Sequence, residues 1–304
     1  MADNDRLFLD FSRASRLLAR GGWKRVSLLF DDAEREFELA WGKVHSEFQN
    51  RPQDAKVASA QLIEAQPLTS ALALAIARTD TVELFGRFKR LLESILVKTE
   101  RLSGYPAVRG IPHVQAGFLY MTTSVMALHW EAWGTLEKLL TSKFEWYYQS
   151  GRAIFSYPFE MPYFFHSEAF GRSANTIHDF FRERLSSPEF VRVTQLTGDS
   201  LLDAYTQTQM LMSLRVAQLH ENGESARIWP DFGRFYGHRV VRLLDRAYTD
   251  PEFGSGVLRA FGEDRGTFFS HLNQRLSIIS SIFFRGAPFL YESLGSWEPR
   301  ETHA

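Results

Sequence analysis

Residues 114–130 read VQAGFLYMTTSVMALHW, a largely apolar stretch without Asp, Glu, Lys or Arg. A helix that spans a bilayer needs about 20 mostly apolar residues. This stretch has only 17 residues, and five of them are polar: Gln115, Thr122, Thr123, Ser124 and His129. The pattern therefore predicts a helix buried in a protein core, in a soluble protein with no membrane partner.

Helical spacing continues on the N-terminal side of this stretch. Residues 81–102 place apolar side chains three and four residues apart, which is typical of one face of a helix. Asp80 and Glu83 are placed to cap its start, and Gly104 and Pro106 are placed to end it.

Four further segments show the same pattern. Apolar stripes cover residues 5–19 and 25–48, and an Ala/Leu-rich run covers 67–77. A long helical stretch with few charges extends over 112–149, and Gly134 is expected to divide it.

Two later segments share a helix-start signature. Ser187 precedes Pro188, and Asp250 precedes Pro251. Ser and Asp are good N-cap residues, and Pro suits the first helical position because no amide donor is needed there. We expect a helix to begin at each proline.

Strand signals are scarce, because no run alternates cleanly over six residues beside a hairpin turn. The sequence therefore predicts an all-α fold, an irregular multi-helix bundle or helical-hairpin array of roughly ten to twelve helices with no sheet. A helical N-terminal part (1–150) and a helical C-terminal part (151–304) are expected to meet at a soft seam near 150–165. One continuous domain is the alternative.

Composition excludes several kinds of site. The chain has no Cys, so it has no disulfide, thiolate zinc site or thiol nucleophile, and a cytoplasmic location is expected. Its formal net charge is −1, and acidic and basic residues balance in each third, which argues against bulk attraction to nucleic acid. The 28 Arg against 7 Lys are typical of a GC-rich, bacterial genome.

Motifs for common enzyme classes are missing from the sequence. There is no phosphate-binding loop, no dinucleotide-binding glycine pattern and no nucleophile elbow. His129 with Glu131 and His166 with Glu168 have the H-x-E spacing of zinc deaminases, but those enzymes also need cysteine ligands. No metal site and no cofactor are predicted.

A magnesium-dependent prenyl-diphosphate enzyme is the third hypothesis for function. Asp31 and Asp32 partly match an Asp-rich motif, and Asp199 and Asp203 are one helical turn apart. The second Asp-rich motif is missing, so Asp31 and Asp32 are better explained as a solvated helix start.

A metal-independent ribonuclease is the second hypothesis. Arg and His four to six residues apart resemble the pair with which HEPN-type ribonucleases cleave RNA, where Arg stabilises phosphorane charge and His moves a proton. Arg172 with His178 is the best of three such pairs; the others are Arg215 with His220 and Arg265 with His271. About two and a half pairs are expected by chance from the Arg frequency, so three carry no evidence.

Residues 153–170 are rich in aromatic side chains and contain Pro158 and Pro162, which prevent a regular helix. The segment is predicted to pack as an interdomain corner or to form the wall of a ligand pocket. The candidate pocket residues are Tyr157, Phe159, Tyr163, Phe165 and His166.

Arginine and aromatic side chains alternate over residues 227–246, and the last three arginines share one face of a predicted helix. The surface consists of Trp229, Phe232, Arg234, Tyr236, His238, Arg239, Arg242 and Arg246. Such a surface can be a solvated helix face, a protein interface or an anion or nucleic-acid site.

These features together favour a non-catalytic interaction protein, acting as a regulatory or scaffold subunit, over an enzyme. The expected partner is another protein or a second copy of the chain, with nucleic acid weakly supported. No catalytic residue is assigned under this hypothesis.

Overall fold

The computed structural model of the chain describes residues 5–80, 82–98, 105–147, 153–158, 174–226, 237–283 and 297. Within these residues there are fourteen α-helices, of which thirteen have seven residues or more. The all-α class is confirmed, with somewhat more helices than the ten to twelve expected.

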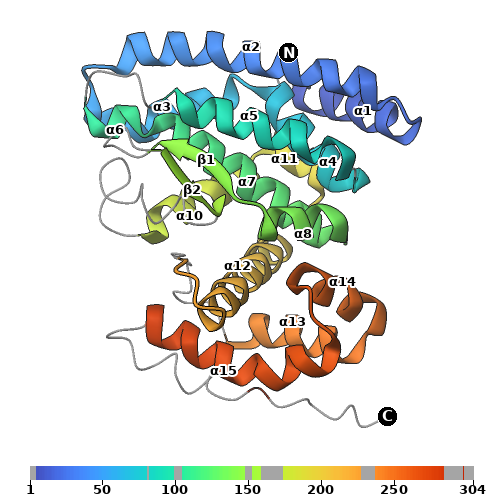
Figure 1. The fold of residues 1–304 in the computed structure, drawn as a ribbon. Helices are drawn as coiled ribbons and strands as arrows, with labels where there is room; N and C mark the ends of the chain where they lie inside the picture. Colours follow the sequence, from blue (N-terminus) through green and yellow to red (C-terminus); the bar gives the residue numbers. More distant parts are fainter. Residues whose placement is uncertain are drawn as a thin grey trace.

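The first part of the chain contributes eight helices, which form the upper layers of Figure 1. They are α1 (Arg6–Ala19), α2 (Trp23–Phe48), α3 (Ala55–Glu64), α4 (Pro67–Thr79), α5 (Phe85–Val97), α6 (Pro106–Arg109), α7 (Ile111–His129) and α8 (Trp133–Thr141). Two short 3-10 turns, η1 (Pro52–Asp54) and η2 (Val82–Leu84), precede α3 and α5.

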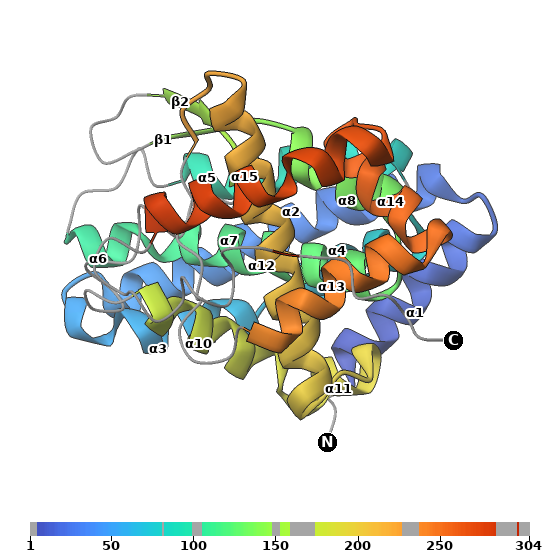
Figure 2. The same cartoon turned by 90° about the horizontal axis from the view of Figure 1, so that it is seen from below.

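The second part contributes six helices: α10 (Ala174–Leu185), α11 (Pro188–Thr194), α12 (Gly198–Glu221), α13 (Gly237–Thr249), α14 (Pro251–Phe261) and α15 (Arg265–Phe283). α10 and α11 lie with the upper layers, and α11 packs against α1. Seen from below, α13 and α15 lie over α12, which runs between them and α7 (Figure 2).

The uncharged stretch 114–130 forms most of α7, the central helix. Every residue from Ile111 to Leu128 is buried, because α4, α5, α8 and α12 pack around the helix. A helix that is covered on all sides has no polar face, which explains why its sequence lacks charge. The prediction of a buried core helix is confirmed.

The boundary between α7 and α8 differs from the expected one. The chain turns at Glu131, whose φ is +56°, rather than at Gly134, which lies inside α8. Asp80 also acts differently from the prediction: its carboxylate accepts hydrogen bonds from the amides of Gly134 (3.0 Å) and Thr135 (2.5 Å). Asp80 therefore caps α8, 54 residues away, instead of the helix that follows it in sequence.

One small sheet corrects the expectation of none. Strands β1 (Phe144–Tyr147) and β2 (Ala153–Ser156) pair antiparallel, with Phe144 opposite Ser156 and Tyr147 opposite Ala153. Phe144 is fully buried and its ring meets that of Phe85 edge-on, which holds the hairpin on α5. Each strand has only four residues, too few to show an alternating pattern in the sequence.

The second part of the chain is attached to the first by specific contacts. α14 packs on α8, and the Trp133 ring meets the Phe253 ring edge-on at a centroid distance of 5.0 Å. The proposed seam lies largely outside the described residues, so the division into two parts stays a prediction.

Candidate functional site

The predicted Arg–aromatic surface is described only at its C-terminal end. Four of its residues lie outside the described part of the chain: Trp229, Phe232, Arg234 and Tyr236. Two more, His238 and Arg239, lie in the first turn of α13, where only the backbone is described. For these six the predicted role stays a prediction.

The two remaining arginines of that surface contact other helices of the same chain. Arg242 Nη1 lies 3.3 Å from the Asp203 carboxylate of α12. Arg246 Nη2 lies 2.6 Å from the Glu131 carboxylate in the α7–α8 turn, and its guanidinium lies 3.9 Å from the centre of the Phe253 ring. Both arginines therefore help to fix α13 to the rest of the molecule, which leaves their charges partly neutralised.

The predicted aromatic pocket is also only partly described. Tyr157 is buried, its ring faces the Lys143 ammonium at 5.1 Å, and its hydroxyl lies 3.5 Å from the Glu224 carboxylate. The other four candidates lie outside the described residues: Phe159, Tyr163, Phe165 and His166.

His178 of the predicted ribonuclease pair lies in the protein interior. It is 2% exposed, and its Nδ1 lies 2.7 Å from the Tyr205 hydroxyl and 2.9 Å from the Gln209 amide nitrogen. A general acid or base must come within hydrogen-bonding reach of its substrate, and this imidazole is surrounded by protein. Arg172 lies outside the described residues, so the pairing stays a prediction.

The other two Arg–His pairs are each engaged separately. Arg215 hydrogen-bonds to Gln218, while the His220 ring lies 2.8 Å from the Ala226 carbonyl oxygen. Arg265 lies over the Tyr248 ring at 4.7 Å and donates to the Tyr248 carbonyl. None of these contacts brings Arg and His of a pair together.

The Asp-rich motif lies inside α2, not at a helix start as expected. Asp31 pairs with Arg87 of α5 at 3.5 Å, and Asp32 pairs with Arg35 at 3.8 Å. Among the described residues, no three His, Asp or Glu side chains come together as metal ligands.

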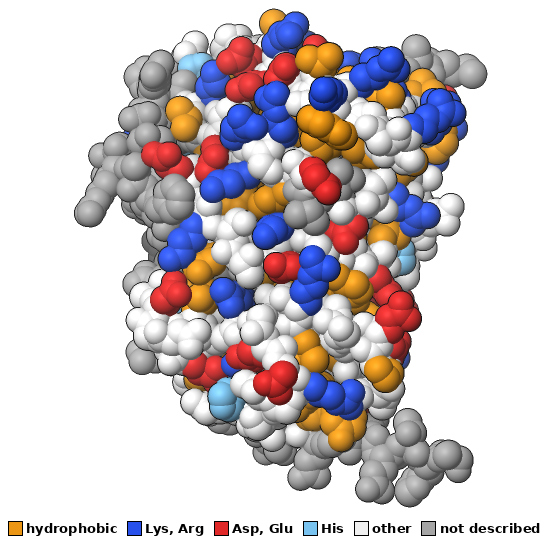
Figure 3. All heavy atoms as spheres, turned by 45° about the vertical axis from the view of Figure 1, so that its right-hand side comes forward, with side chains coloured by type: hydrophobic (Ala, Val, Ile, Leu, Met, Phe, Trp, Pro, Cys, Tyr) orange, Lys and Arg blue, Asp and Glu red, His pale blue; other side chains and the backbone are white. Residues whose placement is uncertain are grey.

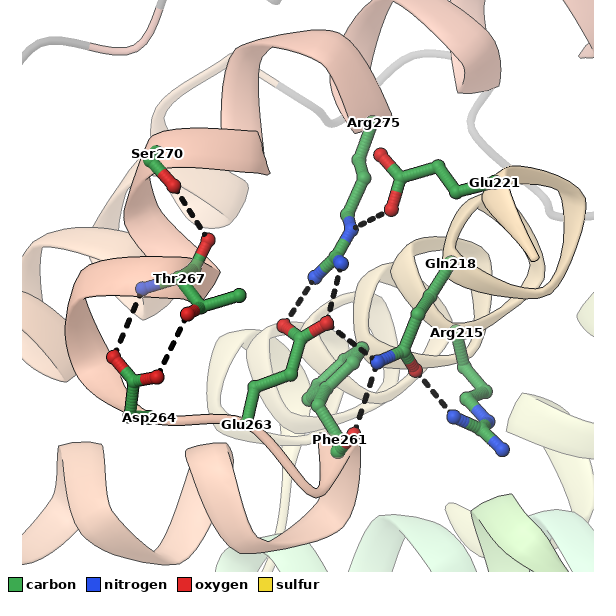
Figure 4. Close-up of polar contacts among 9 residues, drawn as sticks. All are labelled: Arg215, Gln218, Glu221, Phe261, Glu263, Asp264, Thr267, Ser270 and Arg275. Carbon is green, nitrogen blue, oxygen red and sulfur yellow. Dashed lines mark hydrogen bonds and ion pairs between the residues drawn. The ribbon is translucent and has the colours of Figure 1, made fainter.

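A buried ion network joins α12 to α15 (Figure 4). Arg275 is 1% exposed and donates to both oxygens of Glu263, at 2.6 and 2.8 Å, and to Glu221 at 2.8 Å. Gln218 donates to Glu263 at 2.7 Å and to the Phe261 carbonyl at 2.9 Å. These bonds tie the α14–α15 connection and α15 to the end of α12.

The network also shifts the pKa values of its members. Burial raises the pKa of Glu263, but hydrogen bonds from Arg275 and Gln218 outweigh it, and the net pKa is lowered. Burial lowers the pKa of Arg275, but its bonds to Glu263 and Glu221 outweigh that effect and raise it. Glu263 and Arg275 are therefore charged at neutral pH, and the network is a structural ion cluster that closes the core.

A group of exposed charges of one sign lies where α1 meets α2. Residues 11–30 contain no acidic residue and five basic ones: Arg13, Arg16, Arg20, Lys24 and Arg25. All five are exposed, and in the described part of the chain none has a carboxylate within 4 Å. We call these five residues, with the exposed side chains of Leu9, Trp23 and Leu28, the α1–α2 tip.

The tip combines its charges with exposed apolar groups. Leu9, Arg13, Arg16 and Arg20 repeat at intervals of four, three and four residues and so share the solvent face of α1. Leu9 is 60%, Trp23 51% and Leu28 63% exposed. Figure 3, in which this side of the molecule comes forward, shows Lys and Arg side chains with hydrophobic ones among them over its upper part, and Asp and Glu side chains beside them.

A comparison of charges over thirds of the chain hides this surface. Eight acidic residues within 5–49 balance the eight basic ones, and the average conceals their separation. A count of acidic and basic residues in windows of 20 residues reveals residues 11–30, with five basic residues and no acidic one.

Comparisons with known proteins add no relative: no family model matches the chain, and no curated protein and no solved structure is significantly similar to it. None of the helices that the structure describes is long and apolar enough to cross a membrane.

Proposed function

We propose that this chain is a non-catalytic α-helical interaction protein that binds an acidic segment of another protein on the α1–α2 tip. The observation that carries the proposal is the set of five exposed cations with no described carboxylate within 4 Å, interleaved with the exposed side chains of Leu9, Trp23 and Leu28. Trp and Arg are enriched in protein interfaces, and clustered charges of one sign steer a partner of the opposite sign.

The apolar groups favour a protein partner over nucleic acid. Leu9 and Leu28 are aliphatic, so they gain binding energy when apolar side chains of a partner cover them. A phosphate backbone offers no such cover, and nucleic-acid binding would rest on the five charges alone. A second copy of the chain is disfavoured as well, because a symmetric dimer would place two basic tips together.

The proposal concerns a regulatory or scaffold subunit rather than an enzyme. The Arg–aromatic surface around α13 remains a second candidate docking site, although Arg242 and Arg246 already pair with Asp203 and Glu131. The ribonuclease and prenyl-diphosphate hypotheses gain no supporting contact from the described residues.

The experiment compares two charge-reversed proteins. Arg20→Glu with Arg25→Glu reverses two tip charges that make no described ion pair, while Lys43→Glu with Arg90→Glu changes the net charge equally at exposed sites elsewhere. The probes are a fluorescently labelled Glu-rich peptide with interspersed Leu and a labelled single-stranded oligonucleotide of the same net charge.

We expect the unaltered protein to bind the peptide more tightly than the oligonucleotide. The tip variant should lose on the order of tenfold in peptide affinity, since two attractions become repulsions, and the control variant should lose little. Equal peptide affinity in all three proteins would overturn the proposal, and so would tighter binding of the oligonucleotide.

A further inference from the structure

A cavity of about 460 Å³ lies between α1, the α3–α4 connection and the end of α10 with the start of α11. Ligand sites in proteins usually have volumes of about 300–1,000 Å³. The cavity is therefore large enough for a small molecule, and it is separate from the α1–α2 tip.

Three apolar side chains, Leu7, Ile63 and Phe190, line the cavity, and each is at least nine-tenths buried. Each comes from a different segment of the chain, and Phe190 is held by an edge-on contact with Phe118 of α7. The cavity therefore has an apolar lining that the packed core keeps in place.

Ser70 lines the same cavity and has an unsatisfied hydroxyl group. It is 2% exposed, and its Oγ has no hydrogen-bond partner. The hydroxyls of Ser59, Ser124 and Ser213, on other buried helices, each donate to the carbonyl four residues earlier at 2.8 Å. A buried hydroxyl without a partner is unfavourable, so a group that would bond to it has a reason to bind there.

Arg184 provides a second free donor in the cavity wall. Its Nη atoms bind the Glu64 and Glu183 carboxylates, whereas its buried Nε has no partner. Ser70 and Arg184 can both donate a hydrogen bond, and an acceptor such as a carbonyl oxygen would satisfy either of them.

The charges around the cavity cancel. Two basic residues, Arg6 and Arg184, and two acidic residues, Glu64 and Glu189, line it. Arg6 is paired with Glu36 at 2.7 Å, and Arg184 with Glu64, so neither guanidinium charge is left uncompensated. An anionic ligand would lose its hydration without gaining a free counter-charge, and the two unpartnered groups of the wall, Ser70 Oγ and Arg184 Nε, favour an acceptor over an ammonium group.

We propose that this cavity is a binding site for an uncharged, largely apolar small molecule that carries a carbonyl or similar acceptor. The apolar body would lie against Leu7, Ile63 and Phe190, and the acceptor would bond to the Ser70 hydroxyl, with Arg184 Nε as a further donor. This site is independent of the docking function proposed for the tip.

The test uses three probes that share one apolar body and differ in charge: 4-phenylbutyramide, 4-phenylbutyrate and 4-phenylbutylamine. Their affinities are measured on the full chain by calorimetry or ligand-observed NMR. The variants are Ser70→Ala, the matched control Ser59→Ala, which removes a buried hydroxyl elsewhere, and Ala65→Phe, which adds a ring at the exposed rim of the cavity.

We expect the amide to bind more tightly than both charged probes. Ser70→Ala should weaken it about tenfold, Ser59→Ala should leave it unchanged, and Ala65→Phe should abolish binding. The proposal is overturned if no probe binds, if a charged probe binds more tightly than the amide, if Ser70→Ala has no effect, or if binding survives Ala65→Phe.

Discussion

Arg275 shows how a single residue can organise the C-terminal helices. It is a charged side chain with 1% exposure, and it satisfies the carboxylate of Glu263 and one oxygen of Glu221. Burying charges is unfavourable by itself, so the network stabilises the fold only while all its partners are present. Its bonded pairs are 12, 45 and 54 residues apart, which is why no local sequence pattern predicts it.

Replacing Arg275 with Met should therefore be strongly destabilising. The substitution leaves Glu221 and Glu263, both largely shielded from solvent, without a counter-charge, and we expect the free energy of unfolding to fall by about 3 kcal/mol. Urea denaturation measures this change. The control is Arg259→Met, which breaks an exposed ion pair with Glu137 and should cost at most about 1 kcal/mol. Similar losses in both variants would contradict the importance of burial here.

The lowered pKa of Glu263 makes a prediction about pH. A carboxylate whose pKa is lower in the folded state stabilises the protein above its ordinary pKa of 4.5, and this contribution is lost as pH falls through the folded value. Asp250 and Asp264 act in the same direction, whereas the raised pKa values of Asp10 and Glu36 act in the opposite one. A variant of Glu263 alone separates its contribution from these.

We expect the stability difference between the unaltered protein and Glu263→Gln to shrink as pH falls from about 6 to about 3. Urea denaturation over this range gives the difference directly. A gap that stays constant with pH would show that Glu263 titrates normally in the folded protein.

At the scale of helices, the sequence predicted where helices form better than it predicted how they are capped and how they pack together. The expected helices over 5–19, 25–48 and 67–77 correspond closely to α1, α2 and α4, because their apolar stripes repeat with the helical period. Asp250 caps α14 as expected, accepting from the amides of Glu252 and Phe253. Ser187 occupies the N-cap of α11 without a side-chain hydrogen bond, so the same signature has different geometry at the two sites.

Contacts between distant helices could not be predicted in this way. α14 approaches α8 so closely that a Cβ added to Gly256 would lie 2.2 Å from the Trp133 ring. In sequence, Gly256 is simply a poor helix former. The reason for a glycine at this position is visible only when the packing of α14 on α8 is known.

Gly256→Ala should therefore destabilise the protein by about 1–3 kcal/mol, because the Trp133 ring must move away from its contact with Phe253. Gly42→Ala is the matched control, since Gly42 lies in the exposed middle of α2 and a Cβ there meets no atom within 4 Å. We expect that change to stabilise by about 0.5–1 kcal/mol. Thermal and urea denaturation measure both, and equal effects would contradict the close packing of α8 and α14.

At the scale of the whole molecule, the fold class followed from the sequence but the candidate site did not. The charge-free stretch predicted a central buried helix, and α7 is that helix. The sequence-based candidates concentrated on segments rich in Arg and aromatic residues after position 150, most of which lie outside the described residues. The charges of the tip are separated along the sequence, within residues 11–30, but only the packing shows that Leu9, Trp23 and Leu28 are exposed beside them.

The proposed docking on the tip and the alternative docking on α13 predict different footprints. Amide hydrogen exchange of the full chain, with and without a saturating Glu-rich peptide, distinguishes them most directly. The account predicts added protection within residues 9–28 and no change over 237–250. Protection over 237–250 with none at the tip would contradict it and would place the docking surface on α13.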